Sequence, residues 1–351
     1  MTIVMSSPDK VGKYRITDVI GEGAGGVVFR AFDPSLQRVV AVKRLRRALP
    51  SEADAAHAVA ARLREQAQAV SRVAHQGIVA VYEIDEFRGH AFIAMEHVDG
   101  LNLEQWLAAA PLPPQAALLQ VMEQLLDALE CAHLSGVRHG DIKPTNLIVT
   151  TTGLVKITDF GLARAEGRTG GAAGVAPEYL SGRLIDHRVD LYAAGAILYR
   201  MLVGRDPFAD ASDRPAVGAA LRPPGMIAAA HRPSTFDAIV AKALAHDPNQ
   251  RFSSAAEFRE ALHGTVERRL CEQSAGIMVR VVSDGGPIGR EAGDPAPAAG
   301  DVGGRPTRFA QRGGGAAASI PTLTIAIPPN VLAMPSSDPW AHHRVEGGMA
   351  P

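Results

Sequence analysis

The sequence predicts an α+β fold, with strands toward the N-terminus, helices further along, and a tail outside the folded region. Short apolar runs typical of strands, such as YRITDVI, RVVAVKRL and GHAFIAM, fall within the first hundred residues. A pattern typical of a buried helix, HRVDLYAAGAILYRMLV, follows much later. Residues 265–351 contain 13 glycines and 10 prolines and have neither helical nor strand periodicity. We therefore expect a folded region over residues 12–264 and a mostly disordered tail.

The composition of the whole chain argues against several classes of protein. Of its 351 residues, 46% are hydrophobic and 21% are charged, which is enough to bury a core. The net charge of -1 gives no global attraction to nucleic acid. Cys131 and Cys271 are far apart and indicate neither a disulfide framework nor a zinc site. The N-terminal stretch MTIVMSSPDKVGK lacks the pattern of a signal peptide, and no apolar run reaches the about 18 residues of a membrane span, so we expect a cytoplasmic protein.

A glycine-rich stretch, VIGEGAGGVVFRAF, places Gly21, Gly23 and Gly26 between two predicted strands. A dinucleotide-binding turn should lead into a helix, whereas these glycines lead into the strand-like run 27–29. The Gly-Lys-Ser/Thr of a Walker-type loop is also missing. The pattern favours a hairpin whose tip presents backbone N–H groups to phosphates. A plain hairpin with a bulge is the alternative.

A lysine occupies the next predicted strand, RVVAVKRL. Strand alternation puts Val40 and Val42 on one face, and Ala41 and Lys43 on the other. A lysine in an apolar strand is costly to bury unless an anion meets it. Its spacing from the glycine turn favours a Lys43 that faces phosphate, with an edge-strand lysine that reaches solvent as the alternative.

Two further motifs carry acidic and amide side chains beside apolar strands. In HGDIKPTN, Asn146 follows Asp141 by five residues, and in KITDFGLAR, Asp159 follows Asn146 by 13 residues. Each motif alone is common, but the two at this spacing rarely arise by chance. Carboxylate and amide oxygens are the ligands that Mg²⁺ prefers.

On these motifs, residues 14–264 resemble the protein serine/threonine kinase domain of the bacterial eukaryotic-like type. The resemblance implies the two-lobed protein kinase fold, with an N-lobe of about 12–98 and a C-lobe of about 99–264. It also implies transfer of the γ-phosphate of Mg-ATP to hydroxyl groups of a protein substrate.

The resemblance further implies a role for individual residues. Asp141 would orient the attacking hydroxyl, Lys143 would neutralise the γ-phosphate, and Asn146 and Asp159 would hold magnesium. Backbone groups of Glu96 and Val98 would bond the adenine edge, and Met95 would lie behind it. The full set of implied ATP contacts is Ile20, Gly21, Gly23, Gly26, Val28, Ala41, Lys43, Glu65, Met95, Glu96, Val98, Asn146, Ile148 and Asp159.

The identity of the acidic partner that the family requires for Lys43 depends on the register of the next predicted helix. The helical stretch over 52–75 places Val70 and Val73 on one stripe. An ungapped count puts Gln66 on that stripe and Glu65 about 100° away around the helix. A one-residue bulge would bring Glu65 back toward Lys43. We predict Glu65, with Gln66 as the alternative.

Gly140 stands where protein kinases most often carry arginine. Small-molecule kinases of the aminoglycoside- and choline-kinase type commonly carry His-Gly-Asp at the same spacing, so the pattern belongs to working catalysts. Lys143-Pro144, Asp159-Phe160-Gly161 and Ala176-Pro177-Glu178 favour the protein-kinase side. Besides these two classes, a nucleotide-binding pseudokinase or scaffold remains an alternative, because the helix register and the activation segment depart from the family pattern.

The resemblance also implies supporting and regulatory residues. Asp190 would brace the backbone of the catalytic loop, and Glu178 would form a buried pair with Arg251. Only 14 residues separate Gly161 from Ala176, with Thr169 as the one hydroxyl residue among them. Because Gly140 has no charge to offer a phosphate, we expect activity that is independent of phosphorylation in this segment. The tail could bind partners or carry autophosphorylation sites, with a passive linker as the simpler interpretation; the candidate sites are Thr307, Thr322 and Thr324.

Overall fold

The computed structural model describes residues 9–23, 25–48, 65, 68–109, 112–160, 176–181, 185–207 and 234–265. All of these except Gly264 and Thr265 belong to one compact unit. Gln66, Thr169, Cys271 and the predicted tail beyond Thr265 lie outside the described residues. The disorder expected of the tail therefore stays a prediction.

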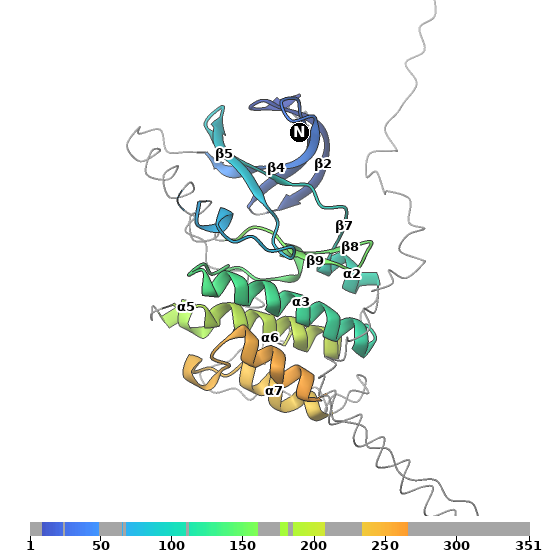
Figure 1. Cartoon of the computed structure of the whole chain (residues 1–351), viewed down its shortest axis with the longest axis vertical. Helices are drawn as coiled ribbons and strands as arrows, with labels where there is room; N and C mark the ends of the chain where they lie inside the picture. The colour runs from blue at the N-terminus through green and yellow to red at the C-terminus, as the bar shows by residue number, and fades with distance from the viewer. Residues whose placement is uncertain are drawn as a thin grey trace, which may run out of the picture. The chain divides into compact units, whose positions relative to one another are not determined.

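The N-terminal lobe is built on one antiparallel sheet of six strands in the order β1-β2-β3-β4-β6-β5 (Figure 1). Its strands are β1 (Lys10–Val11), β2 (Tyr14–Gly23), β3 (Gly26–Asp33), β4 (Arg38–Ala48), β5 (Val81–Phe87) and β6 (His90–Glu96). Strand alternation buries one face of this sheet, where Phe29, Val40, Val42 and Phe92 belong to one apolar cluster. The strands predicted from YRITDVI, RVVAVKRL and GHAFIAM are confirmed.

A second, three-stranded sheet carries the loops that contain the acidic motifs. It consists of β7 (Gly100–Asn102), β8 (Leu147–Thr150) and β9 (Val155–Ile157), all antiparallel. The 3-10 turn η1 (Pro144–Asn146) leads directly into β8. Because β8 and β9 are neighbours, Asn146 and Asp159 emerge from adjacent strands. Backbone bonds tie β9 to the segment before β5: Ile157 N–H donates to the Gly77 carbonyl at 2.8 Å, and Val79 N–H to the Ile157 carbonyl at 2.9 Å.

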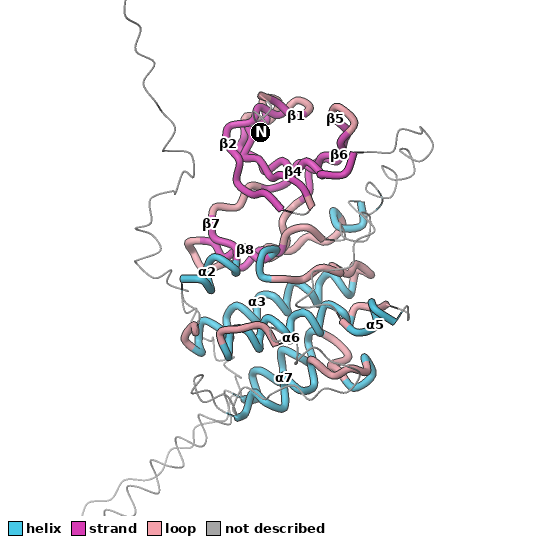
Figure 2. Tube along the Cα trace, turned by 180° about the vertical axis from the view of Figure 1, so that it is seen from behind, coloured by secondary structure: helices cyan, strands magenta, loops and turns pink. Residues whose placement is uncertain are grey.

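The C-terminal lobe is helical, as the sequence predicts (Figures 1 and 2). Its labelled helices are α2 (Leu103–Ala109), α3 (Gln115–Leu134), α5 (Pro177–Ser181), α6 (Arg188–Val203) and α7 (Asp237–Ala243), with 3-10 turns η3 (Ser234–Phe236) and η4 (Pro248–Gln250). A last described helix covers residues 255–265. Helix α3 packs against α6, and α6 packs against α7.

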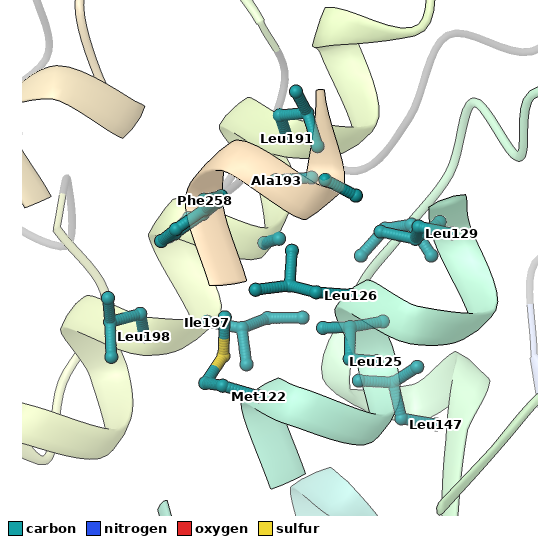
Figure 3. Packing of buried hydrophobic residues seen from close by; sticks show 14 of the residues in the cluster. Met122, Leu125, Leu126, Leu129, Leu147, Leu191, Ala193, Ile197, Leu198 and Phe258 are labelled. Carbon is teal, nitrogen blue, oxygen red and sulfur yellow. The ribbon is translucent and has the colours of Figure 1, made fainter. Parts of the chain in front are cut away.

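Helix α6 lies at the centre of this lobe. Thirteen of its 16 residues are buried, so it has no solvent face. Side chains of α3 and α6 form one cluster with Leu147 of β8 and Phe258 of the last helix (Figure 3); the labelled members are Met122, Leu125, Leu126, Leu129, Leu147, Leu191, Ala193, Ile197, Leu198 and Phe258. The core of this lobe therefore lies next to the loop around His139 and Gly140, whose backbone N–H groups donate to Asp190 of α6.

The predicted α+β fold with a β-rich first lobe and a helical second lobe is confirmed. Across the described ranges, no helix has both the length and the apolar character needed to cross a membrane.

Candidate active site

The loop that carries His139, Gly140 and Asp141, here called the catalytic loop, is held in place by a buried carboxylate. Asp190 is 1% exposed, and its Oδ2 and Oδ1 accept the backbone N–H groups of His139 and Gly140 at 2.8 and 2.7 Å. His133 Nε2 lies 2.9 Å from the same Oδ2. Burial by itself raises the pKa of Asp190, but the hydrogen bond and charge of His133 outweigh it and lower the pKa below its ordinary value. The predicted brace by Asp190 is confirmed.

Gly140 has a backbone that suits glycine. Its φ is +81°, a left-handed conformation that costs other residues about 1–2 kcal/mol. The Tyr179 hydroxyl donates to the Gly140 carbonyl at 3.2 Å, and a Cβ added at Gly140 would also lie 3.2 Å from that hydroxyl. An arginine at this position would therefore meet both backbone strain and a crowded neighbour.

The two predicted catalytic side chains lie in contact. Lys143 Nζ donates to Asp141 Oδ2 at 2.6 Å. The Asp141 N–H donates to His139 Nδ1 at 3.1 Å, which leaves His139 Nε2 to donate its hydrogen to the Thr158 carbonyl at 2.8 Å. His139 thus links Asp141 to the residue that precedes Asp159.

Asn146 and Asp159 supply the oxygen atoms of the predicted metal site. Asn146 is buried, and its Nδ2 donates to the Asp141 carbonyl at 2.9 Å, so its Oδ1 remains an acceptor. Asp159 has φ +67°, a conformation that non-glycine residues adopt rarely and often at functional sites. Among the described residues, no group of three or more His, Cys, Asp or Glu side chains is arranged to hold a metal ion. Two oxygen donors fit Mg²⁺, which keeps several waters and takes few protein ligands.

Lys43 is buried in β4 and paired with a different acid from the one predicted. It is 7% exposed, and its Nζ lies 2.5 Å from Asp159 Oδ2. Glu65 is helical and exposed, while Val70 and Val73 are buried, as the ungapped helical register requires. Among the described residues, the expected Lys43–Glu65 pair is thus not formed. A role for Glu65 in nucleotide binding stays a prediction.

The residues predicted to surround adenine come together in one apolar cluster. Ala41 and Met95 face each other across β4 and β6, and they pack with Val79, Val28 and Val98. Two other predicted contacts, Ile20 and Ile148, lie outside this cluster. Ile20 is 48% exposed, and Ile148 of β8 pairs with Asn102 of β7.

The three glycines of the predicted phosphate loop lie on the β2–β3 hairpin but differ in what they require. Gly23 and Gly26 pair at its tip. A Cβ added at Gly26 would lie 2.1 Å from the Arg44 carbonyl oxygen, whereas one at Gly23 would meet nothing within 4 Å. The strand packing therefore requires glycine at position 26, whereas position 23 has space for a side chain. Gly21 falls between these cases, at 3.8 Å from Val28.

Sequence reasoning missed two contacts that position the site. Lys156 of β9 pairs with Glu96 at 2.8 Å, so the end of β6 is linked to the strand that leads to Asp159. The contact of Tyr179 with Gly140 was also not predicted. The sequence did contain one signal for this contact. Tyr179 directly follows Glu178, which was expected to be fixed by Arg251, so its backbone was also expected to be fixed.

The Glu178–Arg251 pair itself is confirmed. Both side chains are buried, and the guanidinium meets the carboxylate through two bonds of 2.7 and 2.8 Å. Arg251 also donates to the Ala245 carbonyl at 2.7 Å. The pair fixes the beginning of α5 against the segment that follows α7.

A curved antiparallel sheet, a helical lobe, and a buried lysine that meets the Asp-Phe-Gly carboxylate beside the catalytic loop together define the protein kinase class. The family model described as protein kinase domain matches residues 14–264, and the chain belongs to this family.

Curated relatives are serine/threonine-protein kinases of bacteria. A probable serine/threonine-protein kinase of Streptomyces coelicolor is 34% identical over 321 residues, covering 86% of this chain and 45% of the relative. PknJ of Mycobacterium tuberculosis is 37% identical over 272 residues, 71% of this chain and 44% of the relative. PrkC of Bacillus subtilis is 34% identical over 262 residues, 70% and 39% respectively. The chain spans less than half the length of these relatives.

Proposed function

We propose that this chain is a serine/threonine protein kinase that transfers the γ-phosphate of Mg-ATP to hydroxyl groups of protein substrates. The observation that carries the proposal is the linked arrangement of Lys43, Asp141, Lys143, Asn146 and Asp159. Direct hydrogen bonds join Lys43 to Asp159, Lys143 to Asp141, and Asn146 to the Asp141 backbone. Membership of the family and the similarity to bacterial serine/threonine-protein kinases support the same activity.

Each residue of this arrangement has a role that its chemistry allows. Asp141 orients the attacking hydroxyl and accepts its proton, and Lys143 places a positive charge beside Asp141, where the γ-phosphate would lie. Asn146 and Asp159 would hold Mg²⁺, which neutralises phosphate charge when bound. Lys43 is a buried cation that would face the phosphates. The Ala41–Met95 cluster would receive the adenine ring.

A labelled-nucleotide experiment separates this function from its alternatives. The full chain is incubated with Mg-ATP labelled at the γ-phosphate and a mixture of protein substrates, an aminoglycoside and choline, beside an Asp141→Asn variant. We expect label on serine or threonine of protein in the wild type only. Nucleotide binding without transfer by either chain would instead support a pseudokinase. Label on an aminoglycoside or choline, with none on protein, would support a small-molecule kinase.

The pseudokinase is retained as the second candidate because of one observation. Lys43 is bonded to Asp159, while Glu65 is exposed. In this arrangement Lys43 is bonded to Oδ2 of Asp159, which is one of the two predicted metal ligands. A chain that keeps this pair in the presence of Mg-ATP would bind nucleotide without catalysing transfer.

We also propose that activity does not depend on phosphorylation of the activation segment. The support is local: Gly140 carries no side chain, and its N–H and carbonyl are occupied by Asp190 and Tyr179. Thr169 lies outside the described residues. We expect a Thr169→Ala variant to keep the transfer rate of the wild type. A variant that folds and binds ATP but transfers no phosphate would contradict this proposal.

A further inference from the structure

We propose that Tyr179 is a positioning residue that ties the catalytic loop to the start of α5 through its hydroxyl group. The inference rests on the proposed kinase function and adds to it a residue that acts on the reacting groups through the loop backbone. The contact that carries it is the hydrogen bond from the Tyr179 hydroxyl to the Gly140 carbonyl, at 3.2 Å.

Tyr179 is a well-anchored donor. Its ring is half-buried against the main core, and its N–H donates to the Ala176 carbonyl at 3.0 Å. The preceding residue, Glu178, is fixed by the two bonds to Arg251. Because the backbone and ring of Tyr179 are already fixed, the hydroxyl loses little conformational freedom when it bonds the loop. The hydrogen bond therefore stabilises the loop more than one from a mobile side chain would.

The acceptor lies one residue before the catalytic aspartate. Gly140 is held on both sides of its Cα, because its N–H donates to Asp190 Oδ1 at 2.7 Å and its carbonyl accepts from Tyr179. That carbonyl belongs to the same peptide unit as the Asp141 N–H, which donates to His139 Nδ1. The plane of this peptide, from which the Asp141 side chain departs, is thus fixed by one bond at each end.

Gly140 and Tyr179 depend on each other sterically. A Cβ at residue 140 would lie 3.2 Å from the tyrosine hydroxyl, closer than most such contacts. The absence of a side chain at Gly140 therefore lets the hydroxyl approach the carbonyl. The result is a neutral link between the end of the activation segment and the loop, formed without a phosphate or an arginine.

The alternative is that Tyr179 only fills space in the core. Tyr179→Phe separates the two interpretations, because it removes the hydroxyl and keeps the ring. Tyr82→Phe is the matched control, since Tyr82 is 40% exposed on β5 and the Arg38 guanidinium, 3.6 Å from the ring centroid, contacts the ring.

The experiment measures kcat, KM for ATP, melting temperature, and amide hydrogen exchange over residues 137–149 in the full chain. For Tyr179→Phe we expect kcat to fall about three- to tenfold, the range for losing one neutral hydrogen bond. We expect an unchanged KM, and exchange in the loop that is faster by a similar factor. Tyr82→Phe should change none of these. A Tyr179→Phe chain with the kcat and loop exchange of the wild type would overturn the proposal.

A double-mutant cycle guards against a purely structural effect. Gly140→Ala crowds the hydroxyl, so adding Tyr179→Phe should relieve part of its defect, and the two effects on loop exchange should not add. Additive effects would overturn the link. The exchange measurement needs no catalysis, so a wild type that transfers no phosphate would count against the proposed function and leave the test of the link intact.

Discussion

Gly140 illustrates how the backbone conformation of a single residue decides which side chain it tolerates. Its φ of +81° and the hydroxyl 3.2 Å from a Cβ built there both favour glycine. The absent arginine is thus accompanied by a local structure that disfavours any side chain at this position. The groups required for chemistry at Asp141, Lys143 and Asn146 remain in contact beside it.

Replacing Gly140 with arginine should therefore harm the protein rather than restore it. For Gly140→Arg we expect the free energy of unfolding to fall by about 1–2 kcal/mol from the left-handed backbone alone. We also expect the transfer rate to fall, because the side chain displaces the Tyr179 hydroxyl. Chemical denaturation and a steady-state assay measure the two effects.

Gly136→Arg provides the control. Gly136 has φ +72° but open space around its Cβ position, and it lies at the end of α3 rather than in the catalytic loop. The Gly136→Arg variant should lose a similar free energy of unfolding while keeping the transfer rate of the wild type. A Gly140→Arg variant faster than the wild type would show that glycine is a defect at this position.

At the scale of elements, the sequence was informative wherever one face or a whole segment is buried. The strands β2, β4 and β6 and the buried helix α6 follow from the apolar runs and periodicity of the sequence. The partner of Lys43 did not follow, because Asp159 is 116 residues away and periodicity says nothing about which long-range acid a lysine meets. The exposure of Glu65 was foreseeable from the helical register, while the bulge needed to turn it inward had no sequence signal.

The last described helix, residues 255–265, depends on charged groups at its beginning. Glu257 accepts the Ser253 N–H at 2.7 Å, its own N–H donates to Ser254 Oγ at 3.0 Å, and Lys242 of α7 donates to its carboxylate. The Lys242 hydrogen bond, followed by those from Ser253, lowers the pKa of Glu257 from 4.5 to about 2. This helix is thus joined to α7 through an ionised carboxylate.

A carboxylate with a lowered pKa stabilises the folded state above its unfolded pKa of 4.5, and this stability is lost as pH falls toward about 2. Glu257→Gln should therefore lower the free energy of unfolding at pH 7. The difference between variant and wild type should shrink between pH 4.5 and 2. Denaturation at these pH values measures it, with Glu260→Gln at an exposed position of the same helix as control. A difference that stays constant over this range would refute the assignment.

At the scale of the whole described molecule, ion pairs join segments that are far apart in the chain. Glu178 and Arg251 are 73 residues apart, and their side chains are 3% and 0% exposed. Arg259 and Asp127 form another pair, at 31% and 48% exposure. Burial makes the two pairs very different in energy, because a buried charge that loses its partner cannot be hydrated.

Removing one member of each pair tests this difference. Arg251→Ala should lower the free energy of unfolding by about 3–5 kcal/mol, since Glu178 would remain as an uncompensated buried charge. Arg259→Ala should cost about 0–1 kcal/mol, as expected of a solvent-exposed pair. Urea denaturation of both variants at neutral pH gives the comparison. Equal losses would mean that burial does not control these energies.

The measurement that tests the central claim most directly is the rate of γ-phosphate transfer from Mg-ATP to protein hydroxyls by the full chain and by its Asp141→Asn variant. Nucleotide binding is measured on both chains in parallel. Because the asparagine keeps an oxygen that can accept a hydrogen bond from Lys143, we predict nearly equal binding. We predict a transfer rate at least about a hundredfold lower in the variant, as expected for loss of a general base. A wild-type rate no higher than that of the variant would contradict the claim that this catalytic loop, with its glycine, is a working one.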